Sequence, residues 1–191
     1  MFKKIKYWGM GLALLLGAMQ VYAVEFNQVV TDQSKLTFVS KQMGVGVDGK
    51  FGKFSASIAF DPAHLQTAKA QLDIVMSSID AGSNEANDEV KDKEWFNVKA
   101  FPTAKFVSTA IKALDKNRYE IAGNLTIKGK TKPVTATFTM VPLNAQPATA
   151  RFEGGFVLKR NDFGIGEGNW ADPSVVADEV QIKFNLVAKG K

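Results

Sequence analysis

Cysteine is absent from this chain of 191 residues, and histidine occurs once, as His64. Without cysteine, a disulfide framework and thiolate chemistry are both excluded. A single histidine excludes a multi-histidine metal site and a catalytic triad supported by a second functional histidine. His64 follows Asp61 and Pro62 in a predicted turn, where we expect a solvated surface side chain. We therefore predict no metal site, and no cofactor motif is evident.

The N-terminal segment lacks an apolar run long enough to cross a bilayer. Its lysines precede an apolar run over residues 8–19, well short of the roughly 20 residues that span a membrane. Val21 and Ala23 stand three and one residues before a cleavage point, which is typical of a secretory signal peptide. We expect a signal peptide over 1–23, cleaved after Ala23, and a periplasmic domain over 24–191; a membrane anchor is the disfavoured alternative.

A large excess of positive charge is lacking as well. The net charge is +5, and the lysines of the signal peptide, which carries no acidic residue, account for three of these charges. The remaining domain carries only +2, far below the basic patch that nucleic-acid binding requires. Its 168 residues suffice for one domain with a substantial core and do not favour two.

Alternation of apolar and polar residues is what the sequence has in abundance. The clearest case surrounds a Gly/Lys turn within residues 123–134, because apolar residues alternate on both sides of that turn. A period of two is typical of half-buried antiparallel strands, so we predict a hairpin here. Before the turn the apolar positions are Tyr119, Ile121, Leu125 and Ile127, and after it they are Val134, Ala136, Phe138 and Met140.

The same alternation predicts eight strands along the mature chain. Turn residues such as Pro62 and the pair Asp115 and Lys116 separate neighbouring strands. We expect the strands at about 36–43, 51–60, 70–76, 104–110, 118–127, 134–140, 152–158 and 180–188.

One segment between these strands has a different pattern. Residues 84–97 are rich in Asp, Glu and Lys, which indicates a short exposed helix capped by Ser83 or Asn84. Two pairs of carboxylates stand four residues apart in this helix, Asp88 with Asp92 and Glu85 with Glu89, and either pair could form an acid/base couple. A solvated helix face explains them better.

Strands of this kind, with mostly short connections, favour one closed antiparallel barrel over an open sheet whose edges need protection. We predict an all-β fold, an eight-stranded antiparallel up-and-down barrel with one short helical excursion. Alternate connections then lie at the same end of the barrel. The more elaborate end is the predicted mouth and gathers the connections at 43–50, 81–102, 128–132 and 161–178.

The interior of such a barrel is either filled by side chains or holds one small ligand, and periodicity leaves both readings open. An apolar cavity suits a long apolar molecule such as an isoprenoid, because each buried methylene contributes about 0.8 kcal/mol. Lys128, Lys130 and Lys132 at the mouth could neutralise a phosphate headgroup, although a solvated turn is the favoured explanation. The candidate lining residues, all apolar and of inward parity, are Phe38, Phe54, Phe60, Leu72, Ile74, Phe106, Tyr119, Ile121, Phe138, Phe152, Phe156 and Phe184.

Several motifs follow one another in a specific order along the chain: 49–51 with Phe54 and 60–61, 78–80, 101–106 with 108–109, 123–129 with 131–134, and 160–164. In this order and spacing they resemble the YceI-like family. The resemblance spans nearly the whole mature chain and implies an exported, lipocalin-like barrel that binds polyisoprenoid lipids. The chain departs from the family at Gln33 and Gln42, where members often carry histidine, and at 87–89, an acidic stretch that replaces an Arg-Asp pair and a histidine.

We therefore expect a periplasmic, non-enzymatic protein that binds or carries a polyisoprenoid or similar long-chain amphiphile in the barrel interior. We expect no nucleic-acid partner and no membrane-spanning segment in the mature chain. The sequence does not predict the oligomeric state. One alternative is an enzyme that acts on a lipid or quinone-like substrate with Asp or Glu as acid/base. The other is a stress-linked structural protein whose barrel is filled.

Overall fold

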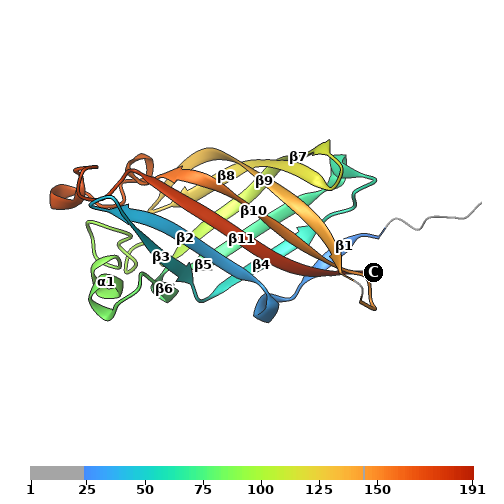
Figure 1. Ribbon diagram of the computed structural model, residues 1–191, viewed down its shortest axis with the longest axis horizontal. Helices are drawn as coiled ribbons and strands as arrows, with labels where there is room; N and C mark the ends of the chain where they lie inside the picture. Colours follow the sequence, from blue (N-terminus) through green and yellow to red (C-terminus); the bar gives the residue numbers. More distant parts are fainter. Residues whose placement is uncertain (1–23, 144) are drawn as a thin grey trace, which may run out of the picture.

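The computed structural model describes residues 24–143 and 145–191, so the predicted signal peptide over 1–23 lies outside the described residues. The described chain forms one antiparallel sheet with one short α-helix (Figure 1). The strands are β1 (Phe26–Val29), β2 (Lys35–Gln42), β3 (Val45–Phe51), β4 (Phe54–Ala59), β5 (Lys69–Val75), β6 (Ile79–Asp80), β7 (Thr103–Asp115), β8 (Arg118–Ile127), β9 (Lys130–Leu143), β10 (Thr149–Lys159) and β11 (Glu179–Gly190). The helices are α1 (Asn84–Glu89) and the 3-10 helices η1 (Thr31–Gln33), η2 (Leu65–Thr67), η3 (Met76–Ser78), η4 (Arg160–Phe163) and η5 (Gly168–Trp170).

The sheet curls on itself, because the chain joins one of its edges to the other. The order of neighbouring strands is β4, β5, β7, β8, β9, β10, β11, β2, β3, β6, and β1 pairs with β11. Only Gly52 and Lys53 separate β3 from β4, so one nearly continuous stretch of chain contributes β4 to one end of this order and β3, beside the two-residue β6, to the other. Phe26 of β1 also bridges Phe60, just beyond β4. The result is a barrel-like sheet whose strands run obliquely along its length (Figure 1).

Each of the eight predicted segments coincides with an observed strand, and the all-β antiparallel class is confirmed. The count of eight is not confirmed, because β1, β3 and β6 bring the described strands to eleven. Most of β3 was predicted to be a turn because of its glycines. Gly49 instead pairs with Phe38 of β2, and a Cβ on Gly49 would lie 2.1 Å from the Phe38 ring. This glycine makes room for an aromatic ring and does not end the strand.

The predicted helical excursion is present but shorter than expected. Ser83 caps α1, since its Oγ accepts a hydrogen bond from the Ala86 amide at 3.2 Å, as the sequence predicts. The helix ends at Glu89 and not near Asn97. The segment that follows turns back so that Trp95 and neighbouring apolar residues pack against the buried core.

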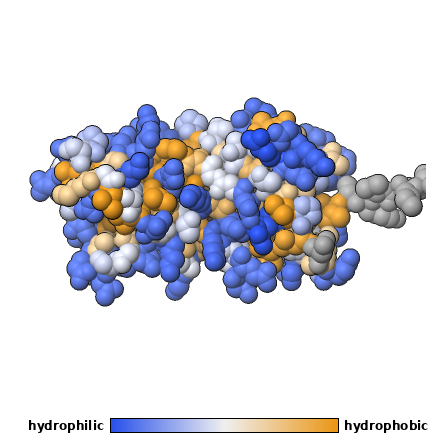
Figure 2. Space-filling model, viewed as in Figure 1, coloured by the Kyte–Doolittle hydropathy of each residue, from blue (hydrophilic) through white to orange (hydrophobic). Residues whose placement is uncertain are grey.

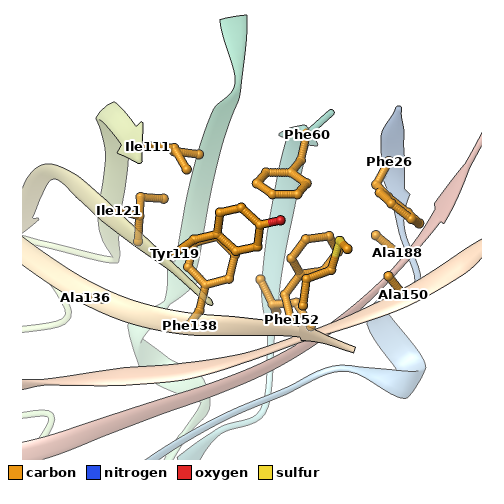
Figure 3. Packing of buried hydrophobic residues seen from close by; sticks show 12 residues of the cluster. Phe26, Phe60, Ile111, Tyr119, Ile121, Ala136, Phe138, Ala150, Phe152 and Ala188 are labelled. Atoms are coloured by element: carbon orange, nitrogen blue, oxygen red, sulfur yellow. The ribbon is translucent and has the colours of Figure 1, made fainter. Parts of the chain in front are cut away.

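One end of the sheet is filled by an aromatic cluster built on Phe60, Tyr119, Phe138 and Phe152 (Figure 3). The centroid of the Phe60 ring lies 5.1 Å from that of Tyr119 and 5.2 Å from that of Phe152, both in edge-to-face geometry. Tyr119 stacks on Phe138 with 5.2 Å between ring centroids. Such pairs each add about 0.5–1.5 kcal/mol beyond the burial of their apolar area. The cluster therefore closes this end of the sheet and stabilises it.

The outer face of the sheet follows the alternation of the strands. On β9, for example, Ala136 and Phe138 are buried, whereas Thr135 and Thr137 are exposed. Figure 2 shows hydrophilic residues over much of the visible face, with apolar patches between them. Among the described residues, no helix has the length and apolar character needed to cross a membrane.

Candidate functional site

The end of the sheet opposite the aromatic cluster encloses a cavity of about 490 Å³. Its volume lies in the range of pockets that bury small ligands, about 300–1,000 Å³. The wall is overwhelmingly apolar and is built by strands from all around the sheet, from α1 and from the segment between β10 and β11. Its floor adjoins the aromatic cluster through Ile121, Ala136 and Leu186, which belong to both.

The structure divides the twelve predicted lining residues into two groups. Seven lie on the cavity wall, namely Phe38, Leu72, Ile74, Phe106, Ile121, Phe156 and Phe184. Five do not line it and instead pack in or against the aromatic cluster, namely Phe54, Phe60, Tyr119, Phe138 and Phe152. Strand parity predicts only that a side chain points inward. It does not predict whether that level of the interior is hollow or filled, because this depends on the packing of residues from distant strands.

The mouth of the cavity lies between α1 and the hairpin of β2 and β3. Of the wall residues that the structure describes, only Gln42, at the end of β2, and Glu85, in α1, are exposed. Glu89, one turn further along α1, is half-buried and also on the wall. Both elements lie at the same end of the molecule in Figure 1.

The predicted gathering of four connections at this end is confirmed by hydrogen bonds between them. The Met43 amide donates to the Val175 carbonyl at 2.9 Å, which joins the β2–β3 turn to the segment before β11. The Gly166 amide donates to the Glu94 carbonyl at 2.9 Å, which joins that segment to the helical excursion. Lys128, in the β8–β9 turn, donates from Nζ to the Gly164 carbonyl at 2.6 Å. The segment 161–178 therefore holds this end of the molecule together.

The buried side chain of Arg160 stabilises that segment through hydrogen bonds to its backbone. Its side chain is only 1% exposed, and all five N–H groups of the guanidinium donate to backbone carbonyls. Nε donates to Ala177 (3.2 Å), Nη1 to Ile165 (2.8 Å) and Gly166 (2.9 Å), and Nη2 to Trp170 (2.7 Å) and Val176 (2.7 Å). The guanidinium carbon also lies 5.9 Å from the centroid of the Trp95 ring. Arg160 thus fixes the fold of a long connection that has few strands or helices of its own.

Burial lowers the pKa of the Arg160 guanidinium, and the nearby charge of Asp178 opposes this shift. The sequence alone does not indicate this role of Arg160. Its residue type and position carry no local signal, since its acceptors are backbone atoms distant along the chain. The only sequence indication is its place in the motif at 160–164.

The three lysines proposed for a headgroup do not belong to the described wall. Lys128 Nζ, besides its bond to Gly164, lies 2.9 Å from Glu167 Oε2, and its side chain is only 9% exposed. Lys130 and Lys132 are exposed at the start of β9. Lys128 therefore links the β8–β9 turn to the segment 161–178 through a hydrogen bond and an ion pair.

Lys128→Met is expected to lower the free energy of unfolding by about 1–2 kcal/mol at pH 7, because two charge-assisted contacts are lost. The hydrogen bond from Lys128 is the main cause that lowers the pKa of Glu167. A carboxyl with a lowered folded-state pKa adds stability above its unfolded pKa, about 4.3, and loses it as the pH falls through the folded value. The difference in free energy of unfolding between the wild type and Lys128→Met should therefore be smaller at pH 3 than at pH 7.

Urea unfolding at pH 7 and pH 3 measures this effect. Lys132→Met, at an exposed position near the start of β9, is the control and should change the free energy of unfolding by less than about 0.5 kcal/mol. If Lys128→Met lowers the free energy of unfolding as much at pH 3 as at pH 7, the ion pair between Lys128 and Glu167 does not stabilise the protein.

The remaining acidic groups and the single histidine lie away from the depth of the cavity. The carboxylates on the described wall, Glu85 and Glu89, lie at the mouth and not in the depth of the cavity. His64 lies outside the wall, and its exposed ring places Nδ1 2.7 Å from Asp61 Oδ2, which lowers the pKa of Asp61. Within residues 24–143 and 145–191, no three His, Asp or Glu side chains are grouped in a way that could hold a metal ion.

Comparison with known proteins relates this architecture to one family. The model of the YceI-like domain matches residues 28–188. A UPF0312 protein of Azotobacter vinelandii is 32% identical over 158 residues, which cover 79% of this chain and 81% of that protein.

Solved structures agree with this assignment. The crystal structure of BcnA from Burkholderia cenocepacia matches with 47% sequence identity and a TM-score of 0.80, and the match covers 85% of this chain and all of BcnA. A polyisoprenoid binding domain from Saccharophagus degradans has the same fold, with 15% identity, a TM-score of 0.65, and coverage of 88% of this chain and 99% of that domain. The chain therefore belongs to the YceI-like family.

Proposed function

We propose that this protein is exported to the periplasm and binds a polyisoprenoid or similar long-chain amphiphile without chemical change. The tail lies in the cavity, and the head lies near the mouth between α1 and the β2–β3 hairpin. The observation that carries the proposal is the apolar cavity of about 490 Å³. Membership of the YceI-like family and the fold shared with a polyisoprenoid binding domain support the ligand class. The apolar run after the N-terminal lysines supports export.

The energetics of the wall favour a long apolar ligand. Each methylene that leaves water for this cavity contributes about 0.8 kcal/mol, so affinity rises quickly with chain length. A polar metabolite would lose its hydrogen bonds to water, at a cost of roughly 1–3 kcal/mol for each uncompensated group. The cavity wall offers few hydrogen-bonding groups that could replace water, since the N–H groups of Arg160 already donate to backbone carbonyls.

The two alternatives receive less support from the same observations. An enzyme needs acid/base groups beside a buried substrate, whereas the carboxylates of the described wall lie at the mouth. A structural protein with a filled interior does not fit a cavity of about 490 Å³.

Val134→Phe is expected to weaken the binding of farnesol at least tenfold, because the added ring occupies space inside the cavity. Val134 is on the wall and only half-buried, so a larger side chain is tolerated by the fold. Val157→Phe is the matched control, because Val157 is 54% exposed and lies off the wall. Displacement of a fluorescent apolar probe by farnesol measures both affinities.

The purified wild-type protein provides the direct test. Native mass spectrometry of material from the periplasm should detect a bound long-chain amphiphile. A ligand-free protein that also fails to bind added prenyl lipids would refute the proposed function.

A further inference from the structure

The mouth of the cavity is acidic. Glu85 and Glu89 occupy positions i and i+4 of α1, so their side chains lie on the same helix face, and both belong to the cavity wall. We call this pair the acidic rim. The other charged residue of the described wall is Arg160, which is buried and engaged with backbone carbonyls. A ligand head at the mouth therefore meets two carboxylates.

The acidic rim has no cation of its own in the described part of the chain. Neighbouring carboxylates are paired, since Asp88 lies 3.6 Å from Lys91 Nζ and Asp80 lies 3.4 Å from Lys50 Nζ. No ion pair within 4.0 Å involves either rim carboxylate among the described residues. Like charges at i and i+4 repel each other, so a cation held between them would stabilise the pair.

Hydrogen bonds favour the ionised form of the first rim carboxyl, Glu85. The backbone amide at Glu85 and the Ser83 hydroxyl donate hydrogen bonds that lower the pKa of the Glu85 carboxyl. The lysine that could have offset this charge does not reach the mouth. Lys128 is held by Gly164 and Glu167. A phosphate head would meet negative charge at the opening of the cavity.

We infer that the cavity selects amphiphiles with a cationic amine head over amphiphiles with the same tail and a phosphate head. This inference rests on the proposed function and adds the class of head to the class of tail. The tail is chosen by the apolar wall, and the head is chosen by the acidic rim. The carboxylates attract an ammonium head and repel a phosphate head. Charge interactions over a few ångströms near a surface favour the affinity for the amine over that for the phosphate by a factor of about ten.

Three ligands with one farnesyl tail test the inference: farnesylamine, farnesol and farnesyl phosphate. Their dissociation constants are measured by displacement of a fluorescent apolar probe from the purified protein at pH 7 and low salt, below the aggregation limit of each ligand. We expect the order amine, alcohol, phosphate, with about tenfold between the first and the last. Added salt should reduce this ratio, because charges at an exposed rim are screened.

The double variant Glu85→Gln/Glu89→Gln should bring the amine and the phosphate to within about threefold. Asp88→Asn/Asp92→Asn is the matched control, since it removes the same charge from the same segment but away from the wall. This control should keep the tenfold ratio. Thermal unfolding of both variants verifies that the fold is retained.

Each outcome bears on a different statement. If the three ligands bind equally, or if the phosphate binds best, the acidic rim does not select the head and this inference fails while the proposed function stands. The same conclusion follows if the glutamine variant keeps the full ratio. If none of the three ligands binds, the proposed function itself fails.

Discussion

Arg160→Met is expected to lower the free energy of unfolding by about 3–5 kcal/mol. The substitution keeps much of the apolar stem but removes all five N–H donors, so five backbone carbonyls of the segment 165–177 lose a partner. Each buried acceptor left without a hydrogen bond costs about 1–3 kcal/mol unless water reaches it. The segment that joins β10 to β11 should therefore loosen first.

Two spectroscopic signals separate local from global effects of Arg160→Met. The described tryptophans, Trp95 and Trp170, lie beside Arg160 with 5.6 Å between their ring centroids, so their fluorescence reports this end of the molecule. Far-ultraviolet circular dichroism reports the whole sheet. We expect the fluorescence transition of the variant to occur at lower urea than the dichroism transition.

The control for this experiment is Arg151→Met. Arg151 pairs with Glu153 at 3.1 Å, but both side chains are about two-fifths exposed, at 40% and 43%. Exposed pairs contribute about 0–1 kcal/mol, so this change should be small. A loss for Arg160→Met that is no larger than that of Arg151→Met would show that the five hydrogen bonds do not hold the segment.

Phe138→Asp is expected to abolish folding or to leave a protein that melts far below the wild type. Phe138 is 7% exposed and contacts Tyr119, Phe60, Phe152 and Phe184 through ring pairs with centroids 5.2–6.5 Å apart. Removing a buried phenylalanine side chain alone costs about 3–5 kcal/mol. A buried carboxyl without a partner adds a further desolvation cost, even when it is protonated, and the two losses together are comparable to the stability of a typical domain.

The comparison variant lies on the same strand. Thr135→Asp introduces the same side chain on the exposed face of β9 and should change the melting temperature little. Circular dichroism during heating measures both variants. A wild-type melting curve for Phe138→Asp would mean that the inward parity of β9 is wrong.

How far the sequence predicts this fold depends on which interactions specify each element. Strands such as β8 and β9 are visible in the sequence because alternation and a tight turn are local properties. β3 was missed because its glycines look like turn residues. Their actual role at Gly49 depends on Phe38, a residue of the neighbouring strand. β6 has only two residues, too few to show any period.

The candidate site was predictable in kind but not in extent. Parity placed Leu72 and Phe184 on the inner face, and they line the cavity, whereas Phe60 and Phe152 have the same parity and fill the opposite end. The difference arises from contacts between residues far apart in the sequence, such as Phe60 with Phe152, and not from the pattern of any one strand. The role of Arg160 was equally hidden, because its acceptors are main-chain atoms that carry no mark in the sequence.

The position of the two ends of the described chain has a practical consequence for measurement. Phe26 of β1 pairs with Gly190 of β11, so both ends meet at the end of the molecule filled by the aromatic cluster (Figure 1). The mouth, marked by Gln42 and Glu85, lies at the other end. A linker joined to Lys191 would therefore attach the protein to a sensor surface with its opening toward the solution. Immobilised in this way, the protein could report the capture of amphiphiles from the flowing sample without obstruction by its own support.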